Sequence, residues 1–231
     1  VGYMYTFPIP EELRLGNAFM MGVKKTCPEC KMIVTPINSW HDPVVEQEAA
    51  KALFDAGAYI VFTGADTPAP AIVAESYKEG KGKWGIPYDW KGSCTSKRCL
   101  TLPYWNWGPV YASIVEGLRD GTYTPGRHYF DGDENGLGLY GFMEGEELTD
   151  GLKDMPEEVL TFVRNYIADI QAGKWTRFDL FSGPIIDNQG NVVVPEGEKM
   201  EDADLDTFDC SATGCKYGMH YWNEGIIAEL P

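Results

Sequence analysis

The sequence predicts an α/β fold in which a mostly parallel sheet is covered by helices on both faces. Three observations carry this prediction. In the first half of the chain, short apolar segments alternate with amphipathic helical patterns. The segments between the apolar runs are long enough for the helical crossovers that parallel strands need. With 231 residues, 44% of them hydrophobic, the chain can bury a full core.

Local signals place the elements of the first half in order. An apolar strand over residues 1–5 precedes a helix over residues 10–23, which has two prolines near its start. After a strand over residues 32–35, Asp42 can cap the next helix, which ends at Gly57. The elements expected next are a strand over residues 59–63, a helix over 69–77, strands over 84–87 and 100–102, and a helix over 107–118.

The second half has a different pattern, beginning with Gly-rich turns over residues 122–142. Residues 178–195 predict a hairpin with an Asp-Asn-Gln-Gly turn. The acidic runs at 144–147 and 196–209 predict solvated surface. An amphipathic helix is expected over residues 156–172, and the side chains of its inward stripe are Val159, Leu160, Val163, Tyr166, Ile167 and Ile170.

The charge balance excludes two classes of partner. The chain has 19 Lys and Arg against 35 Asp and Glu, a formal net charge of −16. A surface this acidic is repelled by the phosphates of nucleic acids and by anionic membranes. No stretch is apolar over the roughly twenty residues that a membrane-spanning helix needs. We therefore expect no nucleic-acid partner.

The cysteines indicate the compartment. Each of three close couples predicts a disulfide across a short loop: Cys27 with Cys30, Cys94 with Cys99, and Cys210 with Cys215. Such bonds need an oxidising compartment, which predicts an extracellular or periplasmic protein. The alternatives are zinc at the Cys-Pro-Glu-Cys spacing and free thiols, although the three histidines form no second zinc motif.

The segments that follow the expected strands predict a binding site, because ligands of parallel sheets bind at the carboxyl ends of the strands. These segments hold aromatic rings, which are Phe7, Trp40, Tyr88, Trp90, Tyr104, Trp105 and Trp107, interleaved with the carboxylate and amide groups of Asp42, Asp66, Asp89 and Asn106. Aromatic faces with a few polar groups suit a flat ring that hydrogen-bonds at its edge. The alternative is that each ring is part of the core.

Motifs for catalysis are missing from the sequence. It contains no nucleophile elbow, phosphate-binding loop, zinc-protease motif or dinucleotide fingerprint. We therefore assign no catalytic residue, metal or cofactor and expect a protein that is not an enzyme. Residues 131–136 match the first half of a calcium loop, but the twelfth position is Phe142. We interpret this segment as a turn, with calcium as the alternative.

Several stretches, taken together, resemble one family and occur in its order over nearly the whole chain. They are residues 1–10 (VGYMYTFPIP), 38–43 (NSWHDP), 48–53 (EAAKAL), 56–61 (AGAYIV), 66–70 (DTPAP), 105–109 (WNWGP), 121–123 (GTY), 181–187 (FSGPIID) and 224–228 (EGIIA). This pattern resembles the basic membrane lipoprotein family, the purine- and nucleoside-binding receptors of ABC uptake systems. The six cysteines are atypical of its bacterial members.

The resemblance implies a type I periplasmic-binding-protein fold, in which two hinged α/β lobes close on a ligand. It implies that residues 1–125 form the second lobe. Residues 126–231 would cross the hinge and return to the first lobe, ending in the hairpin and the Cys-linked tail. A first-lobe segment of about a hundred residues would precede Val1, leaving the first lobe incomplete in this chain. That segment is an expected partner, and a membrane anchor outside this chain is a further expectation.

The resemblance also implies roles for site residues. It places Phe7, Trp40, Gly64, Asp66 and Asp89 at the ligand. Trp105 stands where nucleoside-binding members have a Lys, which favours a free nucleobase, with a nucleoside or another planar ligand as alternatives. The leading hypothesis is thus a purine-binding receptor, with a membrane permease as a further expected partner. The alternatives are an extracellular structural or assembly protein that reuses the fold, and a nucleoside hydrolase.

Overall fold

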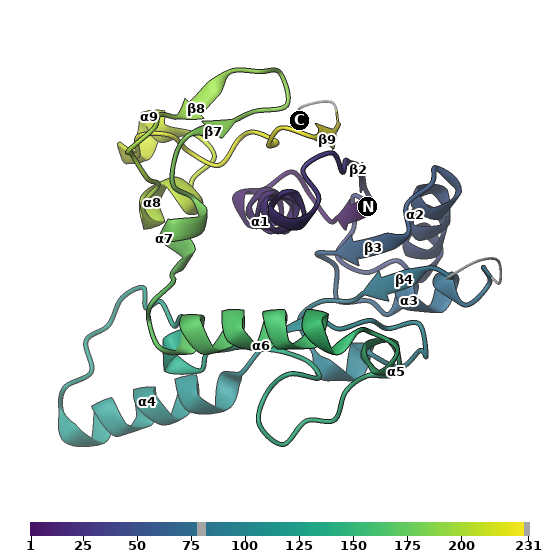
Figure 1. The fold of residues 1–231 in the computed structure, drawn as a ribbon. Helices are drawn as coiled ribbons and strands as arrows, with labels where there is room; N and C mark the ends of the chain where they lie inside the picture. The colour runs from purple at the N-terminus through teal and green to yellow at the C-terminus, as the bar shows by residue number, and fades with distance from the viewer. Residues whose placement is uncertain (78–81, 229–231) are drawn as a thin grey trace.

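The structure is a computed structural model that describes residues 1–77 and 82–228. Its centre is a five-stranded sheet in the order β4-β3-β1-β2-β9, with every neighbouring pair parallel (Figure 1). The strands are β1 (Gly2–Tyr5), β2 (Met32–Pro36), β3 (Ile60–Thr63), β4 (Trp84–Ile86) and β9 (Ile226–Ile227). The predicted parallel α/β sheet is confirmed.

Helices cover both faces of this sheet. Successive side chains of a strand point to opposite faces, so each face carries apolar side chains that a helix can bury. Tyr3 and Tyr5 of β1 pack in one apolar core with side chains of α1 (Pro10–Thr26). Met4 points the other way, into a second core with α2 (Pro43–Asp55). The helix α3 (Ala69–Ala74) contacts α2 and β4 on that face.

The predicted helix boundaries are confirmed where a local cap sets them. Asp42 accepts hydrogen bonds from the backbone N–H groups of Val44 and Val45, both at 3.1 Å. The helix α4 (Trp107–Asp120) ends at Gly121, whose φ of 71° lies in the left-handed region that favours glycine.

The fifth expected strand differs from the prediction. It forms over β5 (Pro103–Trp105) and pairs antiparallel with β6 (Leu137–Leu139) as a separate sheet. Isolated bridges, such as Asp89 with Tyr104, connect it to the main sheet. Pro87 and Pro103 lack the N–H groups that a continuous parallel ladder beside β4 would use.

Two long helices expose more apolar surface than the sequence predicts. In α4 only Val110 is buried, and Figure 1 shows the helix extending away from the main sheet. In α6 (Glu157–Gln171) only Leu160 of the predicted stripe is buried, and Val159 is 44% exposed. Val163, Tyr166, Ile167 and Ile170 are half-buried, so the stripe faces inward as predicted except at Val159, but it is incompletely covered. Within the described residues, no helix is long and apolar enough to cross a membrane.

The C-terminal segment packs against the first half of the chain. Its short elements are α5 (Asp150–Lys153), α7 (Arg177–Leu180), β7 (Ile185–Ile186), β8 (Val192–Val194), α8 (Asp202–Leu205) and α9 (Cys210–Thr213). The hairpin of β7 and β8 confirms the predicted one, and β9 adds to the main sheet beside β2. The family resemblance predicts that residues 126–231 cross the hinge and return to the first lobe. The division into lobes at residue 125 stays a prediction.

All six cysteines form the three predicted local disulfides. The Cα atoms within each pair lie 5.3, 5.5 and 4.8 Å apart, in chain order. The zinc and free-thiol alternatives therefore do not hold. Since each loop is short, each bond fixes a local turn rather than joining distant segments.

Candidate functional site

The parallel sheet brings most of the predicted site residues to one edge. Phe7, Trp40 and Asp66 follow β1, β2 and β3, while Tyr88 and Asp89 follow β4. These strands are neighbours in the sheet and run in the same direction, so their carboxyl ends meet at that edge.

The aromatic side chains of this edge form two groups. In the first, the ring centroids of Phe7 and Trp40 lie 5.1 Å apart. In the second, Tyr88 lies 6.2 Å from Trp105, which lies 6.1 Å from Trp107. Tyr88 is buried, whereas Trp40 and Trp107 are more than half exposed. The exposed rings are available for stacking, while Tyr88 supports the second group from the core.

Gly64 is buried directly against a carboxylate. A Cβ at Gly64 would lie 2.0 Å from Oε2 of Glu12, so the position has no room for a side chain. The Tyr3 and Thr6 hydroxyls donate to Glu12 at 2.7 and 2.5 Å. Burial raises the pKa of Glu12, although these hydrogen bonds oppose the rise. Packing explains Gly64, and its role toward a ligand stays a prediction.

Three carboxylates lie near the aromatic rings. Burial raises the pKa of Asp66, and the negative charges of Asp89 and Glu11 raise it further. Burial also raises the pKa of Asp89. The Tyr88 hydroxyl donates to Glu11 at 3.5 Å. We did not predict Glu11, because an acidic residue in the first turn of a helix is expected from the helix dipole alone.

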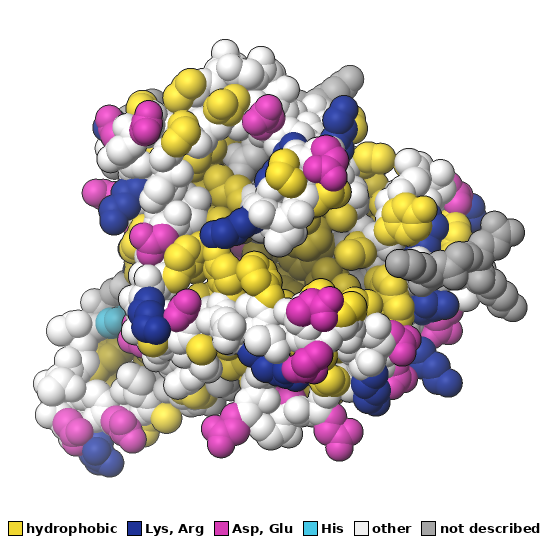
Figure 2. Space-filling view, viewed as in Figure 1, with side chains coloured by type: hydrophobic (Ala, Val, Ile, Leu, Met, Phe, Trp, Pro, Cys, Tyr) yellow, Lys and Arg dark blue, Asp and Glu magenta, His cyan; other side chains and the backbone are white. Residues whose placement is uncertain are grey.

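A cavity of about 520 Å³ adjoins this edge. Tyr88, Trp105 and Trp107 line it, whereas Phe7, Trp40, Gly64, Asp66, Asp89 and Asn106 are outside its lining. Figure 2 shows a hollow with hydrophobic side chains between the α1 and α6 sides of the molecule. Asn106 instead donates its side-chain N–H to the Asn135 carbonyl at 2.9 Å, which ties β5 to the neighbouring loop.

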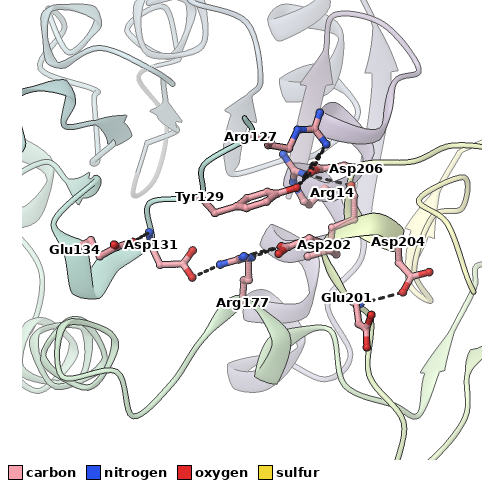
Figure 3. Close-up of polar contacts among 11 residues, drawn as sticks. Arg14, Arg127, Tyr129, Asp131, Glu134, Arg177, Glu201, Asp202, Asp204 and Asp206 are labelled. Carbon is pink, nitrogen blue, oxygen red and sulfur yellow. Dashed lines mark hydrogen bonds and ion pairs between the residues drawn. The ribbon is translucent and has the colours of Figure 1, made fainter. Parts of the chain in front are cut away.

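An ionic network forms another wall of this cavity (Figure 3). Arg177 of α7 pairs with Asp131 and, at 2.6 Å, with Asp202. Asp206 accepts bonds from three side chains, which are Arg14 at 2.5 Å, Arg127 at 3.0 Å and Tyr129 at 2.8 Å. The network therefore joins α1, the loop before β6, α7 and α8.

This network corrects the prediction that the acidic runs are solvated. Asp202 and Asp206 pair with arginines, and Asp204 is buried. In the other run, Glu146 accepts from the Tyr104 hydroxyl at 2.9 Å. The arginine partners lie far away in the sequence, so a local charge pattern could not reveal them.

Metal ligation has little support in the described part of the chain. There, Asp204, Cys210 and Cys215 are the one group of candidate ligands close enough to share an ion. Both cysteines are in a disulfide, and Asp204 accepts backbone N–H groups. The segment considered for calcium contains a 3₁₀ turn, η2 (Gly132–Glu134), and the Asp131 carboxylate binds Arg177.

Proteins of known structure share this α/β fold. Two solved structures of ABC transporter solute-binding proteins are similar to it. That from Conexibacter woesei has a TM-score of 0.55 and 19% identity, covering 75% of this chain and 55% of that one. That from Aeropyrum pernix has a TM-score of 0.57 and 14% identity, covering 75% and 56%.

The sequence identifies the family. Residues 1–163 match the family described as ABC transporter substrate-binding protein, PnrA-like, and the chain belongs to it. The chain is 28% identical over 230 residues to a purine-binding protein of Brucella abortus. It is 30% identical over 177 residues to TsgA13 of Haloferax volcanii, named as a candidate glucose-binding protein of an ABC transporter.

The chain spans about half the length of these curated relatives. The matches cover 100% and 75% of this chain, but 58% and 43% of the two relatives.

Proposed function

We propose that this chain is part of an extracytoplasmic solute-binding protein that captures a purine nucleobase or nucleoside and passes it to a membrane permease without chemical conversion. The observation that carries the proposal is the aromatic group of Tyr88, Trp105 and Trp107, which lines a cavity of about 520 Å³ beside carboxylates. A cavity of this size suits a small ligand.

The expected binding mode follows from these side chains. A purine would stack on the exposed faces of Trp105 and Trp107, which supply apolar area at little entropic cost. Its N–H groups would donate to Glu11, which lines the cavity, since ionised carboxylates are acceptors only. Asp66 and Asp89 lie outside the lining, and their role toward a ligand stays a prediction. Closure of a second lobe over the ligand, implied by the family, belongs to the same proposal.

The two relatives carry names for different ligands, a purine and glucose. Aromatic faces and carboxylates can bind either. We favour a purine because more than half of the side chains that line the cavity are aromatic or aliphatic, which suits a planar ring better than a polyol.

Calorimetric titration of adenine, adenosine and glucose tests the proposal. We expect purine binding that weakens at least ~10-fold in Trp105→Ala, because stacking on an aromatic side chain is worth about 1–3 kcal/mol per base. Trp90→Ala is the matched control, since Trp90 is 67% exposed and outside the cavity lining. Binding of glucose alone, or an equal loss in both variants, would contradict the proposal. Chromatography of the incubated nucleoside checks that no base is released.

A further inference from the structure

Glu12 is a buried carboxyl group at the sheet edge to which the proposed site belongs. It lies in the first turn of α1, and only 2% of its surface is exposed. Its Oε2 accepts the Tyr3 hydroxyl at 2.7 Å, and its Oε1 accepts the Thr6 hydroxyl at 2.5 Å. Both donors are fully buried, which strengthens these hydrogen bonds. The proposed binding mode uses none of these three side chains.

The contacts of this carboxyl group join three neighbouring elements. Tyr3 lies in β1, and Thr6 begins the segment that follows β1. Gly64, which follows β3, leaves the space that Oε2 occupies, because a Cβ there would lie 2.0 Å from that oxygen. On its cavity side, α1 supplies Glu11 and Arg14 to the lining. One carboxyl group therefore holds the first turn of α1, and with it part of the cavity wall, against the ends of two strands.

The Glu12 carboxyl group has two hydrogen-bonding arrangements that differ by one proton. When it is ionised it only accepts, so both hydroxyls donate to it in charge-assisted bonds. When it is protonated it has its own O–H to donate, so one hydroxyl must turn away. The Tyr3 hydroxyl has a second acceptor in the Glu12 backbone carbonyl at 3.0 Å. Protonation therefore exchanges strong bonds to the strand end for weaker ones.

The groups around Glu12 act on its proton in opposite directions. Burial raises its pKa, and the hydrogen bonds from Thr6 and Tyr3 oppose this rise. The charge of Glu11, its neighbour in α1, also raises the pKa. From the end of β4, Tyr88 faces the same region, since burial and nearby acidic groups that include Glu12 raise the pKa of its hydroxyl. The β3 side contributes a glycine, which has no charge.

We propose that Glu12 is a positioning residue, whose ionised carboxylate holds α1 and the ends of β1 and β3 in the arrangement that binds the ligand, and whose protonation weakens ligand binding. This inference rests on the proposed function and adds a regulation of that same site by pH. Glu12 is outside the cavity lining, so it acts through Glu11 beside it and through the strand ends. Because linkage is reciprocal, ligand binding should in turn favour the ionised form.

The first test follows the proton without any ligand. The backbone amide resonances of Thr6, Phe7 and Gly64 are recorded against pH by nuclear magnetic resonance on the 231-residue chain. We expect one transition with a shared midpoint, absent in Glu12→Gln because an amide does not ionise. Glu158→Gln removes the same charge from the exposed first turn of α6 and should keep the transition. The absence of a shared transition, or one that persists in Glu12→Gln, would overturn the inference.

Two variants of Thr6 keep the inference testable if Glu12→Gln does not fold. Thr6→Val removes one donor to the carboxylate and should move the transition to higher pH, because the ionised form loses a hydrogen bond. Thr6→Ser keeps the hydroxyl and should restore the wild-type midpoint. A role in packing alone would affect stability without separating the two midpoints. Equal midpoints in these variants would therefore contradict the inference.

Calorimetric titration with adenine on either side of the midpoint tests the link to the ligand site. On the acid side, the affinity of the wild type should fall at least ~5-fold more than that of Glu12→Gln. If adenine binds equally on both sides while the amides titrate, the regulation is overturned and the proposed function stands. If adenine binds at no pH, the proposed function fails, and the amide transition decides whether Glu12 holds the strand ends.

Discussion

Replacing Asp204 should destabilise the fold more than any other single change in the acidic run. Its Oδ1 accepts the backbone N–H groups of Lys216 and Tyr217, both at 2.7 Å, and of Gly218 at 3.4 Å. Its Oδ2 accepts the N–H of Glu201 at 2.9 Å, which closes a capping box at α8. The side chain is buried, so Asp204→Ala would leave several donors without water or a partner.

The magnitude follows from the two short bonds and the cap. A hydrogen bond to a charged group contributes about 1.5–3 kcal/mol, and loss of a cap costs about 1 kcal/mol. We expect Asp204→Ala to lower the free energy of unfolding in urea by about 4–7 kcal/mol. Asp209→Ala is the control, because Asp209 caps α9 at an exposed position and should cost about 1 kcal/mol.

The pH dependence gives a second readout. Burial alone would raise the pKa of Asp204, but the backbone N–H groups lower it below its ordinary value. A lowered pKa in the folded state stabilises the protein above the unfolded-state pKa, and this contribution is lost as the pH falls through the folded-state pKa. The stability difference between wild type and Asp204→Ala should therefore shrink toward acid pH. Two results would refute this reasoning. One is a loss of unfolding free energy in Asp204→Ala that lies within about 1 kcal/mol of the loss in Asp209→Ala, and the other is a stability difference between wild type and Asp204→Ala that does not vary with pH.

Three further predictions concern other regions and use the same urea unfolding measurement. Gly64→Ala should cost about 1–3 kcal/mol, because its Cβ would lie 2.0 Å from Glu12, whereas Gly22→Ala has open space and should not destabilise. Replacing both Cys210 and Cys215 by serine should cost about 2 kcal/mol, the value for a short closed loop, and no change would contradict it. Tyr111→Gln in α4 should change stability by less than about 0.5 kcal/mol because this ring is 59% exposed, and a core-like loss would show that it is covered.

The sequence predicts elements well where the determining signal is local. Asp42 and Gly121 set helix ends through their own side chain or backbone, without distant partners. The alternation of strands and helices likewise predicts a parallel sheet, since a helical crossover between two strands returns the chain in the same direction. The aromatic group at the cavity was predictable only in part, because Tyr88 follows β4 of the parallel sheet, whereas Trp105 lies within β5 and Trp107 begins α4.

The remaining features depend on contacts between distant residues. Asp206 and Arg14 are 192 positions apart, so the charge run around Asp206 gave no sign that it is paired. The antiparallel pairing of β5 with β6 depends on a loop that follows α4. Glu11 was missed for a different reason, since its position in the first helical turn has a sufficient explanation without a ligand.

The register of the edge strand has a practical consequence for protein engineering. Ile227 of β9 lies level with Ile33 of β2, which in turn lies level with Gly2 of β1, so Gly2 and Ile227 are separated by a single intervening strand (Figure 1). Two strand spacings amount to roughly 10 Å, a gap that a few glycine and serine residues can bridge. A circular permutant with new termini in the β7–β8 turn should therefore fold, and it would place a fluorescent reporter away from the aromatic cavity.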